Sequence, residues 1–196
     1  SGILWIGTWG GGLNKYDPNT HRFSYYRSVP GKHGGIGNNS VSGIRPGKNG
    51  GLWLSTWGGG VKHFDPVEET FTHYRHIPGV ASSLPHDKVN VISLDHDGAL
   101  WAGTYGGGVA RLDRASGKFH RFFREWRTND PDFKRGIIND IIIDKKGNAW
   151  VGTEHSGLFK YETQTGKIVQ YQKNPYGPGL PDNNIQVIFE HPAGTL

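Results

Sequence analysis

The chain has no cysteine and no methionine among its 196 residues. Without cysteine there is no disulfide framework and no thiolate metal site, and the redox compartment stays open. Long apolar runs are also missing and the mean hydropathy is −0.58, so we expect a soluble chain with no membrane segment. Charge of neither sign dominates, since 22 Lys and Arg against 17 Asp and Glu leave a net charge of +5. The basic residues are scattered, which argues against nucleic acid but tolerates other anionic partners.

What the sequence does contain is an internal repeat. One ten-residue phrase occurs four times, at residues 4–13 (LWIGTWGGGL), 52–61 (LWLSTWGGGV), 100–109 (LWAGTYGGGV) and 149–158 (AWVGTEHSGL). The first tryptophans of the four phrases are 48, 48 and 49 residues apart. This agreement indicates a single domain, residues 1–196, with repeats of about 48 residues at roughly 3–51, 52–99, 100–148 and 149–196.

Each period contains four short β-like runs and no sustained helical periodicity. Around Trp53 these runs are residues 41–45, 52–56, 61–64 and 70–74, and a longer link, 76–88, leads to the next period. Three tight connections and one long connection describe a four-stranded antiparallel meander repeated head to tail. The sequence therefore predicts an all-β fold, a β-propeller built of four-stranded antiparallel blades.

The two ends of the chain have complementary patterns. The chain opens in what would be a second strand, at residues 3–5, and closes with a first-strand pattern at residues 185–190. We therefore expect the C-terminal segment to pair with residues 4–8, so that a first and a second strand close the propeller between the termini and hide two sheet edges. This pairing could form a four-bladed ring from one chain or an eight-bladed ring from two chains. The four repeats could also be a piece of a longer propeller.

Two kinds of aromatic residue recur in the repeat. The first tryptophan of each phrase lies among apolar residues and is predicted to wedge between blades as core. These structural residues are Trp5, Trp53, Trp101 and Trp150. The aromatic after the threonine stands in a glycine-rich turn, and because a turn needs glycine for positive φ but no large ring, this aromatic is the candidate for function.

The turn and the long link should lie on the same face of the propeller, around the mouth of its central channel. Aromatic faces there suit sugar rings, with polar side chains nearby for the hydroxyls. The predicted ligand-binding residues are Trp9, Trp57, Tyr105, Glu154, His155, Asn39, Asp87, Asn139 and Asn183. The alternative is structural: the aromatics cap the core, and the Asn and Asp residues form turns ahead of strands.

Motifs for catalysis or metal binding are not found. The histidines form no H-E-x-x-H, and no G-x-S-x-G elbow occurs. The segment Asp95-His96-Asp97-Gly98 resembles the start of a calcium loop but lacks the later ligands, so a turn explains it better. The sequence predicts no cofactor, no metal and no enzymatic activity.

The phrase LWIGTWGGGLNKYDPNTHRFSYYR at residues 4–27, with NNSV at 38–41 and DNNI at 182–185, resembles the two-component regulator propeller repeat. The resemblance implies the periplasmic or extracellular sensor region of a bacterial hybrid two-component histidine kinase, of a kind that detects polysaccharide fragments. Those sensors resemble seven-bladed rings, whereas four repeats are present in this chain.

Three functions follow from these observations. The first is a non-catalytic, carbohydrate-binding sensor module, for which the positive net charge makes an acidic oligosaccharide a plausible ligand. The second is an interaction scaffold that completes a larger propeller by forming a homo-oligomer. The third is a polysaccharide lyase or hydrolase that uses Glu154 or His155 as acid and base.

Overall fold

The structure is a computed structural model that describes residues 2–29, 31, 34–47, 50–122 and 136–191. The elements of these residues are strands, in four antiparallel sheets that we call blades 1 to 4. Blade 1 holds β1 (Leu4–Thr8), β2 (Gly12–Asp17) and β3 (Arg22–Tyr26). Blade 2 holds β4 (Val41–Pro46), β5 (Leu52–Thr56), β6 (Gly60–Asp65) and β7 (Thr70–Tyr74). Blade 3 holds β8 (Val89–Leu94), β9 (Leu100–Thr104), β10 (Val109–Asp113) and β11 (Lys118–Arg121). Blade 4 holds β12 (Ile138–Ile143), β13 (Ala149–Thr153), β14 (Leu158–Tyr161) and β15 (Ile168–Tyr171).

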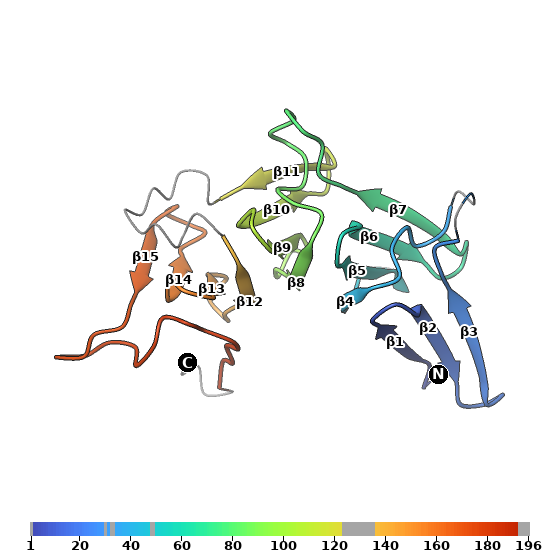
Figure 1. Ribbon diagram of the computed structural model, residues 1–196, viewed down its shortest axis with the longest axis horizontal. Coiled ribbons are helices and arrows are strands. Elements are labelled where there is room, and N and C mark those ends of the chain that lie inside the picture. Colours follow the sequence, from blue (N-terminus) through green and yellow to red (C-terminus); the bar gives the residue numbers. More distant parts are fainter. Residues whose placement is uncertain (1, 30, 32–33, 48–49, 123–135, 192–196) are drawn as a thin grey trace.

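The blades stand side by side around an arc (Figure 1). Strands β4, β8 and β12 lie on its inner side, and β3, β7, β11 and β15 lie on its outer side. Within each blade, strands that are consecutive in the sequence are neighbours in the sheet. The predicted all-β propeller fold, with its meandering blades, is therefore confirmed.

Neighbouring blades are joined by a recurring feature of the first strand. Each complete blade has a β-bulge there, which leaves the second residue of the strand out of register with the second strand. The side chain of that residue turns to the next blade instead. Asn90 Nδ2 donates to the Ile138 carbonyl at 2.9 Å, and Ser42 Oγ donates to the Val89 carbonyl at 2.6 Å. The bulge thus supplies one hydrogen bond across each of these blade interfaces.

Small residues in the second strands allow the blades to approach closely. A Cβ placed on Gly103 would lie 2.5 Å from Ile138 Cγ2, and one placed on Gly7 would lie 2.7 Å from Val41 Cγ1. Such distances are shorter than carbon atoms tolerate. The glycine inside the repeated phrase therefore makes room for the β-branched residue that starts the next blade.

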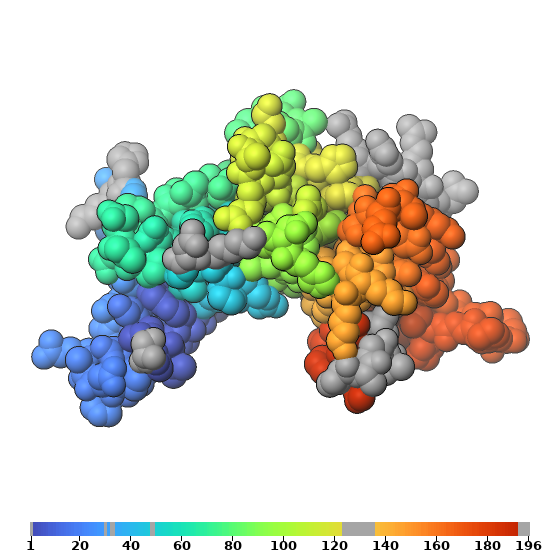
Figure 2. All heavy atoms as spheres, turned by 180° about the vertical axis from the view of Figure 1, so that it is seen from behind, coloured from blue at the N-terminus to red at the C-terminus, as the bar shows by residue number. Residues whose placement is uncertain are grey.

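The predicted closure between the C-terminus and the N-terminus does not form within one chain. Among the described residues, β1 pairs only with β2, so blade 1 has three strands. Residues 185–190 form no strand. They pack beside blade 4, where Ile185 N donates to the Thr153 carbonyl at 2.9 Å. The physical reason is the arc: four blades do not come full circle, and the N-terminal and C-terminal blades stand apart on either side of a hollow (Figures 1 and 2).

The open arc leaves β1 without a neighbouring strand on its inner side. Leu4 and Ile6 of β1 are 55% and 39% exposed, whereas every residue of β5 and β9 is buried. In the ranges that the structure describes, no helix is long and apolar enough to cross a membrane. The buried core lies between successive blades, in three clusters of described residues.

Candidate ligand-binding site

Three of the predicted aromatic residues lie in one continuous row. The ring centroids of Trp9 and Trp57 are 5.8 Å apart, and those of Trp57 and Tyr105 are 5.1 Å apart. Each ring belongs to the turn between the second and third strands of its blade. We call Trp9, Trp57 and Tyr105 the aromatic row.

Backbone pairing sets the spacing of this row. The residue just ahead of each first strand bridges two consecutive turns. Ser40 forms a β-bridge with Trp9 and accepts a hydrogen bond from Trp57 N at 2.8 Å. Lys88 forms a bridge with Trp57 and accepts from Tyr105 N at 2.9 Å. The turns and the long links therefore meet on one face, and the ring positions follow from main-chain contacts rather than from side-chain packing.

The glycines of the turn are required by its backbone. Gly58 and Gly60 have φ values of 108° and 76°, which other residues rarely adopt. A Cβ on Gly60 would also lie 2.2 Å from the Tyr74 carbonyl oxygen. The Thr56 hydroxyl donates to the Gly60 carbonyl at 2.8 Å and closes the turn. The glycines and the threonine of the phrase are thus structural, which leaves the aromatic side chain unexplained by the turn.

The rings of the row are accessible. Trp9 is 71% exposed and Tyr105 is 41% exposed, while Trp57 between them is half-buried. None of the three belongs to the core clusters of the described residues. The ring planes are inclined to one another at 48° and 61°, and rings grouped in this way form an apolar surface of the kind that sugar rings cover. This arrangement favours the functional interpretation of these residues over the capping interpretation.

Lys88 is a member of this site that the sequence interpretation missed. Its side chain is exposed, and Nζ lies 5.6 Å from the ring centroid of Trp57 and 5.7 Å from that of Tyr105. Both distances are within the range of a cation–π contact. The sequence could have indicated it through its position in the repeat, because Lys88 stands as many residues ahead of Trp101 as Ser40 does ahead of Trp53.

Glu154 and His155 continue the row into blade 4. Glu154 N donates to the Ile137 carbonyl at 3.2 Å, and Tyr105 forms a bridge with Ile137. Glu154 Oε1 lies 3.8 Å from His155 Nε2, too far for a hydrogen bond. Glu154 Oε2 is buried and has no hydrogen-bond partner among the described residues. The fourth position of the row therefore presents a carboxylate where the other blades present a ring.

Three of the predicted polar residues hold the link in place. The side-chain oxygens of Asn39, Asp87 and Asn183 accept hydrogen bonds from backbone N–H groups that follow the fourth strands, at 2.7, 2.8 and 2.7 Å. Their own carbonyls accept from glycines of the turns. Asp87 also forms an ion pair with Arg75 at 2.9 Å. These contacts account for the three side chains structurally.

Asn139 is out of register with the other three. The residue equivalent to Asp87 in blade 4 is Gly136, whose carbonyl accepts from Gly106 N and Gly108 N at 3.2 Å. Asn139 instead lies within β12, and its Nδ2 donates to the Ile185 carbonyl at 3.0 Å. It therefore holds the C-terminal segment against blade 4.

Trp5, Trp53 and Trp101 lie between blades, whereas Trp150 stacks on Tyr171 of its own blade at 5.7 Å. Trp101 and Trp53 are 1% and 4% exposed, and Trp5 and Trp150 are half-buried. The Trp5 ring lies 5.5 Å from that of Phe64 in the next blade. In blades 2 and 3 the first tryptophan of the phrase is thus buried in the core, whereas Trp9 at the later position of the blade 1 phrase is exposed.

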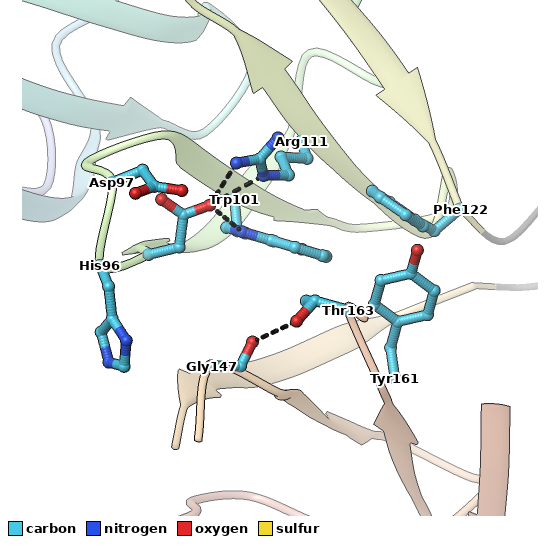
Figure 3. A pocket seen from close by; sticks show the side chains of 9 residues that line it. His96, Asp97, Trp101, Arg111, Phe122, Gly147, Tyr161 and Thr163 are labelled. Carbon is cyan, nitrogen blue, oxygen red and sulfur yellow. Dashed lines mark hydrogen bonds and ion pairs between the residues drawn. The ribbon is translucent and has the colours of Figure 1, made fainter. Parts of the chain in front are cut away.

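A pocket of about 470 Å³ lies between blades 3 and 4, at the turns that join first and second strands (Figure 3). It includes the segment that resembles a calcium loop. Asp95 Oδ1 accepts from Ala99 N at 2.8 Å, and Oδ2 accepts from Arg111 Nε at 2.8 Å and from Trp101 Nε1 at 3.3 Å. Over the described ranges, no group of three or more His, Asp or Glu residues could hold a metal ion. Asp95 thus closes a turn and fixes Arg111.

We expect Asp95→Asn to lower the free energy of unfolding by about 1–2 kcal/mol at pH 7, because Arg111 loses its ion-pair partner. Burial alone would raise the pKa of Asp95, but the hydrogen bond from Arg111, those from Ala99 and Trp101, and the charge of Arg111 lower it below its ordinary value. The ionised Asp95 therefore stabilises the fold at any pH above the ordinary pKa of an aspartate. This stabilisation is lost as the pH falls through the lowered pKa of the folded state. Urea denaturation at pH 7 and at acid pH measures this, with Asp97→Asn in the same turn as the control.

The fold and the row together define a β-propeller whose repeated turns present a row of aromatic rings. Residues 83–106 and 132–155 match the family model described as two component regulator propeller. These matches confirm, for the two matched segments, the resemblance seen in the sequence. No curated protein matches the chain.

Solved structures share the fold. The extracellular domain of BT4673 from B. thetaiotaomicron has a TM-score of 0.76 and 21% identity over 98% of this chain and 24% of that one. The extracellular domain of BT3049 from the same organism, described as a hybrid two component system, has a TM-score of 0.58 and 23% identity over 98% and 30%. Virginiamycin B lyase from Staphylococcus aureus has a TM-score of 0.63 and 15% identity, over 89% of this chain and 53% of the lyase chain. The chain thus spans about a quarter to a third of the length of the two extracellular domains.

Proposed function

We propose that this chain is part of the ligand-sensing region of a periplasmic or extracellular signalling protein, and that the aromatic row binds a saccharide without catalysis. The observation that carries the proposal is the row itself, in which the ring centroids of Trp9, Trp57 and Tyr105 lie 5.8 and 5.1 Å apart and two of the rings are exposed. The repeat family supports the sensing role.

The geometry suits a linear ligand. The row runs from blade to blade along the turns, so a chain of sugar units can lie across successive rings, with its C–H faces on the aromatics. Ser40 and Lys88 of the links bridge to the turns that carry the rings, so their polar side chains are candidates to bind the sugar hydroxyls.

Trp57→Ala is expected to weaken saccharide binding by about ten- to a hundredfold, because it removes the ring that contacts both of its neighbours. A glycan array would identify the ligand, and isothermal titration calorimetry would then give the affinity of each variant. Tyr105→Ala should act in the same direction, and Tyr176→Ala, which removes a tyrosine that is 97% exposed outside the row, is its matched control. Saccharide binding that survives Trp57→Ala and Tyr105→Ala unchanged would contradict the proposal.

A further inference from the structure

Lys88 is placed to read the charge of a ligand on the row. Its Nζ lies over two ring faces at once, at 5.6 and 5.7 Å. No carboxylate of the described residues forms an ion pair with it. The equivalent position holds Ser40 in blade 2 and Ile137 in blade 4, so the backbone role of this position does not require a lysine.

The charges around the row are unequally distributed. Arg27 is exposed and donates from Nε to the Gly11 carbonyl at 3.0 Å, in the turn that carries Trp9, while its guanidinium lies over the Tyr25 ring at 5.4 Å. Arg75 donates to the Gly58 carbonyl at 3.4 Å, although Asp87 neutralises it. The far end of the row carries the Glu154 carboxylate. Lys88 therefore places a positive charge over Trp57 and Tyr105, and Glu154 places a negative charge at the fourth position.

Resting on the proposed saccharide function, we infer that the row selects an acidic saccharide, with a carboxylate or sulfate group at Lys88 and a unit without an anionic group at Glu154. A sugar ring stacked on Trp57 or Tyr105 would bring its substituents to the ammonium that lies above both rings. The ammonium would exchange two weak ring contacts for a charge-assisted hydrogen bond. At the other end, the Glu154 carboxylate repels a second anion and accepts hydroxyl hydrogen bonds.

The test pairs a protein variant with a ligand variant. The probes are oligosaccharides of galacturonate, of alginate and of chondroitin sulfate, each compared with its carboxyl-reduced or desulfated form by isothermal titration calorimetry. Lys88→Gln is expected to lower the affinity for the acidic ligand by about tenfold and the affinity for its neutral form by less than about twofold. The affinity of the unsubstituted protein for the acidic form should fall as salt rises.

Lys15→Gln is the matched control, because Lys15 Nζ also lies over an aromatic ring, at 5.8 Å from the centroid of Trp5, outside the row. It should leave both affinities unchanged. The inference is overturned if the neutral form binds as tightly as the acidic form, or if Lys88→Gln weakens both forms equally. Binding of neutral saccharides alone would remove the inference and keep the proposed function, whereas an array with no saccharide bound at all would remove both.

Discussion

Replacing Trp101 with alanine should lower the free energy of unfolding by about 3–5 kcal/mol, the range for deleting a large buried aromatic. Trp101 is 1% exposed and lies at the interface of blades 3 and 4. Its ring stacks on Phe122 at 4.8 Å and contacts Tyr161 of the next blade at 6.0 Å. Its removal leaves a cavity that two sheets would have to collapse to fill, and it leaves Asp95 without one donor. Urea denaturation followed by far-ultraviolet circular dichroism measures the loss.

Trp9→Ala is the control for this prediction, because the same residue type occupies a different position in the same repeated phrase. Trp9 is 71% exposed, so its removal should change the free energy of unfolding by no more than about 0.5 kcal/mol. Similar losses from both substitutions would contradict the division of the repeat into core and surface tryptophans. A loss confined to Trp101 would support it.

The strands could be predicted from the sequence because each period repeats the same pattern. In blade 2, the second and fourth strands are Leu52–Thr56 and Thr70–Tyr74, as predicted, and the third strand extends one residue beyond its predicted range at each end. Four copies of one pattern average out the ambiguity of any single apolar run. The face that carries the aromatic row followed from the same argument, since the number of strands in a blade determines which connections share a face.

The closure could not be predicted because it depends on the angle between blades. That angle is set by contacts such as Gly103 against Ile138, where the fit of individual atoms decides how closely two sheets approach. Residue patterns record that a small residue faces a β-branched one, but not the rotation that this contact produces. The open edge of β1, with Leu4 55% exposed, is the direct result.

The polar members of the site were harder to predict than its rings. Asn139 was assigned by residue type, although the link ahead of blade 4 places Gly136 at the equivalent position. The contact there is made by a backbone carbonyl, which any residue supplies, so residue type carries no signal. Lys88 was missed for the opposite reason, because its backbone role is shared by Ser40 while the function of its side chain is not repeated.

Lys62 should make the protein less stable at neutral pH than at pH 10. Its side chain is 1% exposed within β6, and its ammonium donates to the Gly59 carbonyl under the turn that carries Trp57. Burial and the charge of Arg75 lower the pKa of Lys62 from 10.5 to about 8, although the charge of Asp87 acts in the opposite direction. A difference of this size corresponds to about 3 kcal/mol. Below pH 8 the folded protein holds a buried charge, and between pH 8 and 10.5 the unfolded chain binds one more proton, so stability rises with pH in that window.

Lys62→Met is therefore expected to raise the free energy of unfolding at pH 7 by about 1–2 kcal/mol, the loss of the hydrogen bond to Gly59 offsetting part of the gain. Phe159 is the equivalent residue of blade 4 and is also buried, so the fold accommodates an apolar side chain at this position. Urea denaturation from pH 7 to pH 10.5 should show a rise in stability for the unsubstituted protein that Lys62→Met reduces by about 3 kcal/mol. Lys15→Met, which removes a lysine that is only half-buried, should keep the rise. An equal rise with and without Lys62 would show that its ammonium stays charged throughout, because a neutral amine in the folded state is what produces the difference.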